Sequence, residues 1–205
     1  MIYKIICNGE DWLSQIYTSD KNEIIIACDG GYDAIYKLGL KCDYFFGDLD
    51  SLNYKGKIKG IKHISSPIKD ETDLELALKF VINIYEENDE IIIYNATGGR
   101  LDHYTCVIRL LKIYKNYNIK IQDIKNKIYI LKSDKEENIK EIEKTTYKYI
   151  SFFNFEKNTI ISLEGFKYDL CNYVMKDDDV LCVSNEIISK GVIKYNRNIL
   201  VIESN

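Results

Sequence analysis

Short apolar runs alternate with helix-like segments through the first half of this 205-residue chain, and this alternation restricts the possible folds. The apolar runs lie at residues 2–7, 23–28, 44–46, 61–64 and 91–94. The helix-like segments lie at residues 11–18, 32–38, 73–87 and 102–115. Strands that alternate with helices predict an α/β domain, in which helices flank a parallel sheet.

The second half of the chain has a different pattern, because short β-rich segments there are separated by polar turns. These segments lie at residues 119–123, 127–131, 146–155, 159–163, 180–184, 191–195 and 199–203. Several alternate with a period of two, which is typical of antiparallel strands that face a core on one side. We therefore expect two domains, an α/β domain at residues 1–118 and an all-β sandwich at residues 119–205.

Composition excludes several classes of function. The chain has 28 basic and 32 acidic residues, and this net charge of −4 argues against a nucleic-acid partner. No apolar stretch is long enough to span a membrane, and the first residues do not resemble a signal peptide. The six cysteines lack CxxC spacing, which favours free thiols in a reducing compartment. We expect a cytoplasmic protein with neither a nucleic-acid nor a membrane partner.

Two glycine-containing loops follow expected strands and carry acidic residues. Glycines in Asp29-Gly30-Gly31 would let the backbone approach a phosphate at a helix start, although a simple tight turn also explains them. Asp48 and Asp50, two residues apart in Gly47-Asp48-Leu49-Asp50-Ser51, could converge on Mg²⁺. A solvated acidic turn is the alternative interpretation.

A third loop, at residues 95–103, contains the pair Gly98-Gly99 followed by Arg100, Asp102 and His103. The guanidinium group of Arg100 offers a planar fork of donors for phosphate oxygens. Asp102 could also be no more than a helix cap.

The segment from Lys69 to Asp73 precedes a strongly amphipathic helix. Lys69 is a plausible phosphate partner, and Thr72 with Glu75 fits a capping box at the helix start. Asp73 in the first helical turn would interact favourably with the helix dipole even without a ligand.

Four motifs occur in this order between Asp29 and His103: DGGYDAIYKLG, DYFFGDLDSL, KDETDLELAL and ATGGRLDH. Together they resemble the thiamine pyrophosphokinase family. The resemblance implies an N-terminal α/β domain, a C-terminal β-sandwich, and a homodimer with active sites between subunits. It also implies Mg²⁺ as cofactor, ATP and thiamine as substrates, and thiamine diphosphate and AMP as products.

The resemblance assigns roles by motif position. Asp48, Asp50 and Asp73 match the Mg²⁺-binding carboxylates and, with Lys69, the catalytic set. The matches to ATP-binding positions are Asp29, Gly30, Thr72, Arg100, Asp102 and His103. In the β-rich half, Ser184 and Asn185 match positions that hold thiamine. Two departures leave the acidic set intact: Val107 replaces a frequent asparagine, and Gly31-Tyr32 replaces a frequent alanine.

Two alternatives from other classes remain open. Asp48 could be the nucleophile of a phosphatase of the haloacid dehalogenase class, although Leu52 stands where that motif has threonine or valine. The chain could also be a nucleotide-binding module without catalytic activity. For the expected transfer reaction, the residue that accepts the hydroxyl proton could be Asp70, Asp73 or Asp102.

Overall fold

The computed structural model describes residues 1–64, 70–177 and 179–205, which divide into two compact units. The first unit comprises Met1–Ile113 with Tyr117–Ile124, and the second comprises Tyr114–Asn116 with Lys125–Asn205. The main division therefore falls near residue 124 instead of the expected 118. The reason is strand β6 (Ile119–Gln122), which pairs in parallel with β5 (Glu90–Tyr94) of the first unit.

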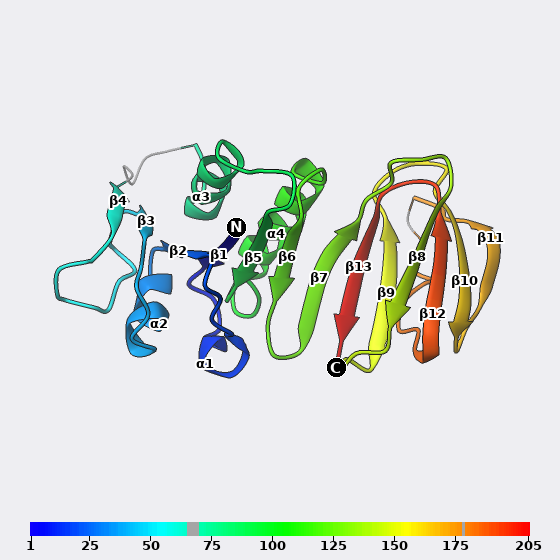
Figure 1. The fold of residues 1–205 in the computed structure, drawn as a ribbon, viewed down its shortest axis with the longest axis horizontal. Coiled ribbons are helices and arrows are strands. Elements are labelled where there is room, and N and C mark those ends of the chain that lie inside the picture. The colour runs from blue at the N-terminus through cyan, green and yellow to red at the C-terminus, as the bar shows by residue number, and fades with distance from the viewer. Residues whose placement is uncertain (65–69, 178) are drawn as a thin grey trace. The chain divides into compact units, whose positions relative to one another are not determined.

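The first unit contains a parallel sheet with the strand order β4-β3-β2-β1-β5-β6 (Figure 1). Its other strands are β1 (Ile2–Ile6), β2 (Glu23–Cys28), β3 (Tyr44–Gly47) and β4 (Ile61–Ile64). Parallel pairing requires crossover connections, and these contain the helices. The α/β class predicted from the alternating pattern is confirmed.

Helices cover both faces of this sheet. They are α1 (Leu13–Ile16), α2 (Gly31–Lys37), α3 (Asp73–Ile82) and α4 (Leu101–Ile113). On one face, Tyr32 and Ile35 of α2 share a buried cluster with Leu13 of α1. On the other, Phe80 of α3 lies against the rings of Tyr44 and Phe46.

Helix α3 begins as its capping box predicts. The hydroxyl oxygen of Thr72 accepts a hydrogen bond from the backbone N–H of Glu75 at 3.2 Å. The helix ends at Ile82, five residues before the predicted end at 87. Local sequence therefore determines the start of this helix more closely than its end.

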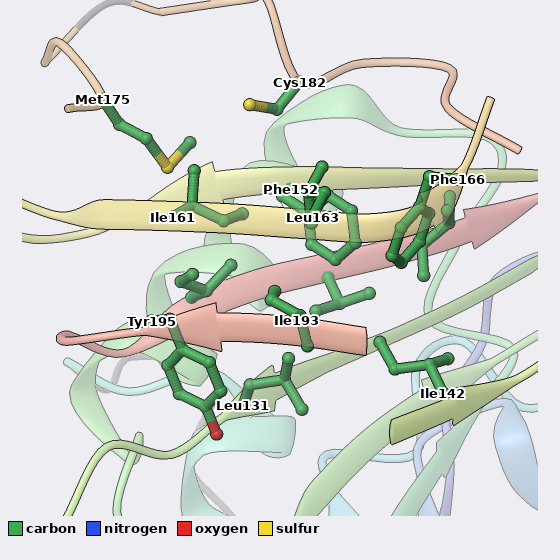
Figure 2. Close-up of a cluster of buried hydrophobic side chains, with 13 residues drawn as sticks. Leu131, Ile142, Phe152, Ile161, Leu163, Phe166, Met175, Cys182, Ile193 and Tyr195 are labelled. Atoms are coloured by element: carbon green, nitrogen blue, oxygen red, sulfur yellow. The ribbon is translucent and has the colours of Figure 1, made fainter. Parts of the chain in front are cut away.

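The second unit consists of two antiparallel sheets, with the orders β7-β13-β9 and β11-β10-β12-β8. The strands are β7 (Asn126–Leu131), β8 (Asn138–Glu143), β9 (Tyr149–Asn154), β10 (Ile160–Phe166), β11 (Leu170–Val174), β12 (Ile187–Tyr195) and β13 (Ile199–Ser204). Side chains from both sheets form one buried cluster, which includes Phe152, Leu163 and Ile193 (Figure 2). The predicted β-sandwich is confirmed.

One predicted strand of the sandwich is wrong and two strands were not predicted. Val180 has no regular structure, residues 181–184 form turns and bends, and the neighbouring Asn185 makes an isolated bridge with Ile150. Val180 and Leu181 are 75% and 60% exposed, so the apolar character of this segment does not mark a core strand. The strands that were not predicted, β8 and β11, are the two edges of their sheet.

Among the described residues, none of the helices has both the length and the apolar character that crossing a membrane requires.

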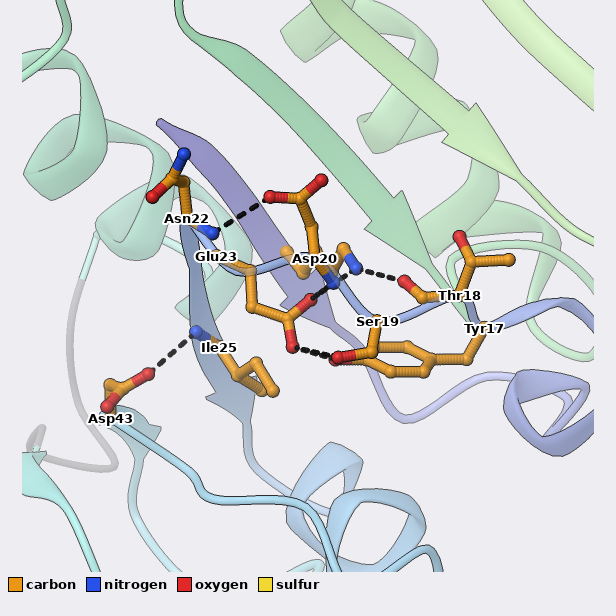
Figure 3. A network of polar contacts seen from close by, with 9 residues as sticks. Tyr17, Thr18, Ser19, Asp20, Asn22, Glu23, Ile25 and Asp43 are labelled. Atoms are coloured by element: carbon orange, nitrogen blue, oxygen red, sulfur yellow. Dashed lines mark hydrogen bonds and ion pairs between the residues drawn. The ribbon is translucent and has the colours of Figure 1, made fainter.

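A buried charged pair links β1 to the start of β2. Lys4 is 1% exposed, and its Nζ donates to the Glu23 carboxylate at 2.5 Å and to the carbonyl oxygen of Thr18. The same carboxylate accepts hydrogen bonds from the Tyr17 hydroxyl at 2.7 Å and from the Asp20 backbone N–H at 2.9 Å (Figure 3). Such a network stabilises the fold only while every charge in it keeps its partner.

We predict that Glu23→Ala lowers the free energy of unfolding by about 3–5 kcal/mol, because it leaves the Lys4 ammonium group buried without its counter-charge. Urea unfolding followed by circular dichroism measures this change. The control is Lys37→Ala, which removes an ion pair between exposed side chains and should cost less than about 1 kcal/mol. Equal losses in the two variants would contradict this account.

Candidate active site

Three carboxylates meet where strands β2 and β3 end. Asp29 directly follows β2, and Asp48 directly follows β3. Because these strands are parallel neighbours with Cys28 opposite Phe46, their carboxyl ends lie at the same edge of the sheet. One carboxylate oxygen from each of Asp29, Asp48 and Asp50 lies within 4.8 Å of the others. We call these three residues the acid cluster.

Backbone geometry brings the two loops of the acid cluster into contact. The backbone N–H of Asp48 donates to the Asp29 carboxylate at 3.1 Å, and the N–H of Asp50 donates to the Asp48 carboxylate at 3.1 Å. A Cβ atom added at Gly47 would lie 1.8 Å from the same Asp29 oxygen. Glycine at position 47 is therefore required for the close approach of the two loops.

Asp73 extends this acidic site from the first turn of α3. Its side chain lies beside that of Asp29 and affects the pKa of that carboxyl group. Burial, followed by the hydrogen bond and negative charge of Asp73 and the charge of Asp48, raises the pKa of Asp29 to about 7. Asp29 was expected to contact the nucleotide, whereas its position groups it with the candidate metal ligands. Thr72 caps α3 and so fixes the helix start from which Asp73 projects.

The glycine-containing loop after β5 leads into α4 and holds Arg100 beside Asp102. The guanidinium group donates two hydrogen bonds to the Asp102 carboxylate, at 2.6 and 3.1 Å. This contact lowers the pKa of Asp102 to about 2. The side chains of Arg100 and Asp102 are 69% and 64% exposed, and His103 is also exposed. These residues are accessible to a ligand from solvent.

A cavity of about 340 Å³ lies beside Gly30, which is the N-cap of α2. Asn8, Asp33 and Asn95 are among the residues that line it. Asn8 and Asn95 come from the loops after β1 and β5, between which the strand order of the sheet reverses, and open α/β sheets bind ligands at such points. Asn8 and Asn95 were not predicted as site residues, although each is a polar residue that follows soon after a buried strand.

Ser184 and Asn185 have different surroundings in the second unit. Ser184 is exposed, has a φ angle of 59°, and its N–H donates to the Ser151 hydroxyl oxygen at 3.0 Å. Asn185 is 3% exposed, and its side-chain amide bonds the backbone N–H and carbonyl of Tyr168 at 3.0 and 2.8 Å. Asn185 therefore holds the Tyr168 turn, whereas Ser184 is accessible.

Lys69 lies outside the described residues, and so the prediction that it contacts a phosphate group is not addressed by this structure.

Comparison with protein families gives two matches along the chain. The model described as "Thiamin pyrophosphokinase, catalytic domain" matches residues 17–122. The model described as "Thiamin pyrophosphokinase, vitamin B1 binding domain" matches residues 130–200. The two matched segments correspond to the α/β unit and the β-sandwich unit.

Individual proteins also resemble this chain over nearly its full length. Thiamine pyrophosphokinase of Bacillus subtilis (strain 168) is 34% identical over 192 residues, which cover 90% of this chain and 88% of that protein. A crystal structure of the B. subtilis thiamine pyrophosphokinase matches with a TM-score of 0.86 and 29% identity, covering 100% of this chain and 99% of the other. The crystal structure of thiamin pyrophosphokinase from Geobacillus thermodenitrificans matches with a TM-score of 0.82 and 26% identity, covering 100% of this chain and 98% of the other.

The four motifs occur in order, both domain models match, and the B. subtilis relative is similar over 90% of this chain. This chain belongs to the thiamine pyrophosphokinase family.

Proposed function

We propose that this chain transfers the diphosphate group of ATP to the hydroxyl group of thiamine at the acid cluster, giving thiamine diphosphate and AMP. This proposal is supported by the convergence of Asp29, Asp48 and Asp50 at one edge of the sheet. These residues come from two of the family-like motifs, and Asp73 of a third motif lies beside Asp29.

The acid cluster has the donor chemistry that Mg²⁺ requires. Mg²⁺ is bound by carboxylate oxygens together with water and phosphate oxygens. The raised pKa of Asp29 indicates that ionising all of these neighbouring carboxyl groups is unfavourable without a cation. Asp48 and Asp50 would hold the ion with Asp29, and Asp73 would either join them or orient Asp29. When bound, Mg²⁺ neutralises charge on the phosphate groups.

The nucleotide would be held by residues at the same edge of the sheet. Arg100 is exposed and can exchange its contact with Asp102 for phosphate oxygens, because a guanidinium fork fits both anions. Gly30 and Thr72 begin α2 and α3, where backbone N–H groups are available to anions. Asp102 and His103 extend the site along α4, and Lys69 would add a positive charge.

The transfer step depends mainly on alignment. The thiamine hydroxyl oxygen attacks the β-phosphorus of ATP, the bond from this phosphorus to the oxygen of AMP breaks, and the hydroxyl proton passes to a carboxylate. Asp70, Asp73 and Asp102 are the candidate proton acceptors. Fixing the two substrates in line supplies much of the rate enhancement in such reactions.

For the thiamine site, the different surroundings of Ser184 and Asn185 support two different roles. The exposed Ser184 is available to the substrate, and the buried Asn185 keeps the Tyr168 turn in place. We retain the proposal of a homodimer with active sites between subunits. Leu101 and Ile113 of α4 are 79% and 66% exposed in the single chain. A second subunit that covered these apolar side chains would remove them from water, which supports the proposed dimer.

The six cysteines are all free thiols, which supports the proposal of a cytoplasmic location. The family assignment gives no support to a haloacid dehalogenase-like phosphatase or to a non-catalytic nucleotide-binding module.

We predict that Asp50→Asn lowers kcat for thiamine diphosphate formation on the order of 100-fold or more, because it removes charge that holds the cation at the phosphates. Product formation is measured by chromatography at saturating Mg²⁺, and circular dichroism checks the fold. Asp20→Asn, which changes an exposed acid elsewhere in the same unit, is the control and should keep normal turnover. Turnover by Asp50→Asn close to that of the wild type would refute the assignment of the metal site.

We predict that Mg²⁺ binding releases protons at acidic pH. The pKa of Asp29 is about 7 in the free protein, so its carboxyl group is protonated below this pH and must ionise to bind a cation. Release should be about one proton per Mg²⁺ at pH 6 and close to zero at pH 8.

Isothermal titration calorimetry with Mg²⁺ alone, in buffers of different ionisation enthalpy, counts these protons. Binding heats at pH 6 that do not depend on the buffer would show that no proton is displaced and that Asp29 is not a ligand.

A further inference from the structure

The loop between β5 and α4 is anchored on one side by the loop after β1. The backbone N–H of Gly9 donates to the carbonyl of Asn95 at 2.8 Å, and the N–H of Glu10 donates to the carbonyl of Thr97 at 3.3 Å. These bonds fix Asn95 and Thr97. The next two residues, Gly98 and Gly99, have no side chains, and their φ angles are 77° and 64°.

Thr97 therefore provides the last side chain in the loop before Arg100. Its hydroxyl donates to the carboxylate of Asp123 at 2.5 Å. Thr97 is 7% exposed and Asp123 is 3% exposed, so this contact is buried. A buried carboxylate is costly to hold unless hydrogen-bond donors compensate it, and the Thr97 hydroxyl is such a donor.

Strand pairing explains how Asp123 reaches this loop. Asp123 follows directly after β6, and the last residue of β6, Gln122, lies opposite Tyr94 of β5. The two parallel strands thus end at the same level, with Asp123 beside the start of the loop. Asp123 also lies near α4. The pKa of Tyr104 in that helix is raised, first by burial and second by the negative charge of Asp123.

We propose that Asp123 is a positioning residue for the nucleotide: through its bond to Thr97 it fixes the Gly98-Gly99 turn and thereby the place at which Arg100 meets the phosphate groups. Glycine residues alone leave this turn with many accessible conformations. The anchor limits them, so that less conformational entropy is lost when ATP binds. This inference rests on the proposed role of Arg100 in ATP binding.

Thr97→Val tests the inference because it keeps the shape of the side chain and removes the hydroxyl donor. We expect the KM for ATP to rise about five- to twentyfold, with little change in the KM for thiamine, because a loosened loop misplaces only the nucleotide. Thr97→Ser keeps the hydroxyl group and should restore the KM for ATP to within about twofold of the wild type. Equilibrium dialysis with ATP and Mg²⁺ gives the same comparison without turnover.

Thr105→Val is the matched control. Thr105 is an exposed residue of α4, and its hydroxyl donates to the carbonyl of Leu101 at 2.8 Å. This bond has no part in anchoring the loop. This variant should leave both KM values unchanged. A thermal unfolding curve for each variant separates loss of the fold from a change in the loop.

Arg100→Ala distinguishes failure of this inference from failure of the proposed function. If Arg100→Ala raises the KM for ATP and Thr97→Val does not, Asp123 has a structural role only and the inference is wrong. If Arg100→Ala leaves the KM for ATP unchanged, the proposed ATP site at this loop is itself wrong. Equal rises in both KM values for Thr97→Val would also overturn the inference, because they would indicate general damage.

Discussion

The parallel pairing of β2 with β3 is the constraint on which the candidate active site depends. It places Asp29 and Asp48 at one edge of the sheet, although 19 positions separate them in the chain. The absence of a side chain at Gly47 then allows the two loops to touch. Asp73 joins from α3, whose start is fixed by the Thr72 cap. Backbone geometry therefore determines where the acidic side chains converge.

This convergence has an electrostatic cost in the free protein. Carboxylates that are partly buried together repel one another, and the pKa of Asp29 is raised by burial and by the neighbouring Asp73 and Asp48. A divalent cation offers a second way to offset the same repulsion. The same arrangement of carboxylates would therefore favour binding of a cation together with the phosphate groups that accompany it.

Local sequence patterns predicted those structural features that depend on neighbouring residues. They failed for features that depend on contacts between distant parts of the chain. The cap of α3 was predicted from Thr72 and Glu75 because both lie within one helical turn. Residues 119–123, which contain β6, were assigned to the second domain because short β-rich segments separated by polar turns begin there. The parallel pairing of β6 with β5 is a distant contact that this local pattern does not contain. β8 and β11 were missed because edge strands need few apolar residues, and most of their positions are exposed or half-buried.

The same limit applies to the candidate site. Motif positions identified Asp48, Asp50 and Asp73, yet no local signal indicates that Asp29 touches Asp73 or that Asp123 receives the Thr97 hydroxyl. Asn185 matched a ligand position in the motif, whereas in the fold its amide holds the Tyr168 backbone. Sequence pattern thus marks residues of suitable chemistry, and the tertiary contacts decide which of them support other residues.

We propose that the acid cluster directs transfer of an intact diphosphate group from ATP to thiamine. The most direct measurement incubates the protein with Mg²⁺, ATP and thiamine and follows AMP, ADP, free phosphate and thiamine diphosphate by chromatography. We expect AMP and thiamine diphosphate to form in equal amounts, without free phosphate or ADP. Release of free phosphate, or binding of ATP without formation of AMP, would contradict it.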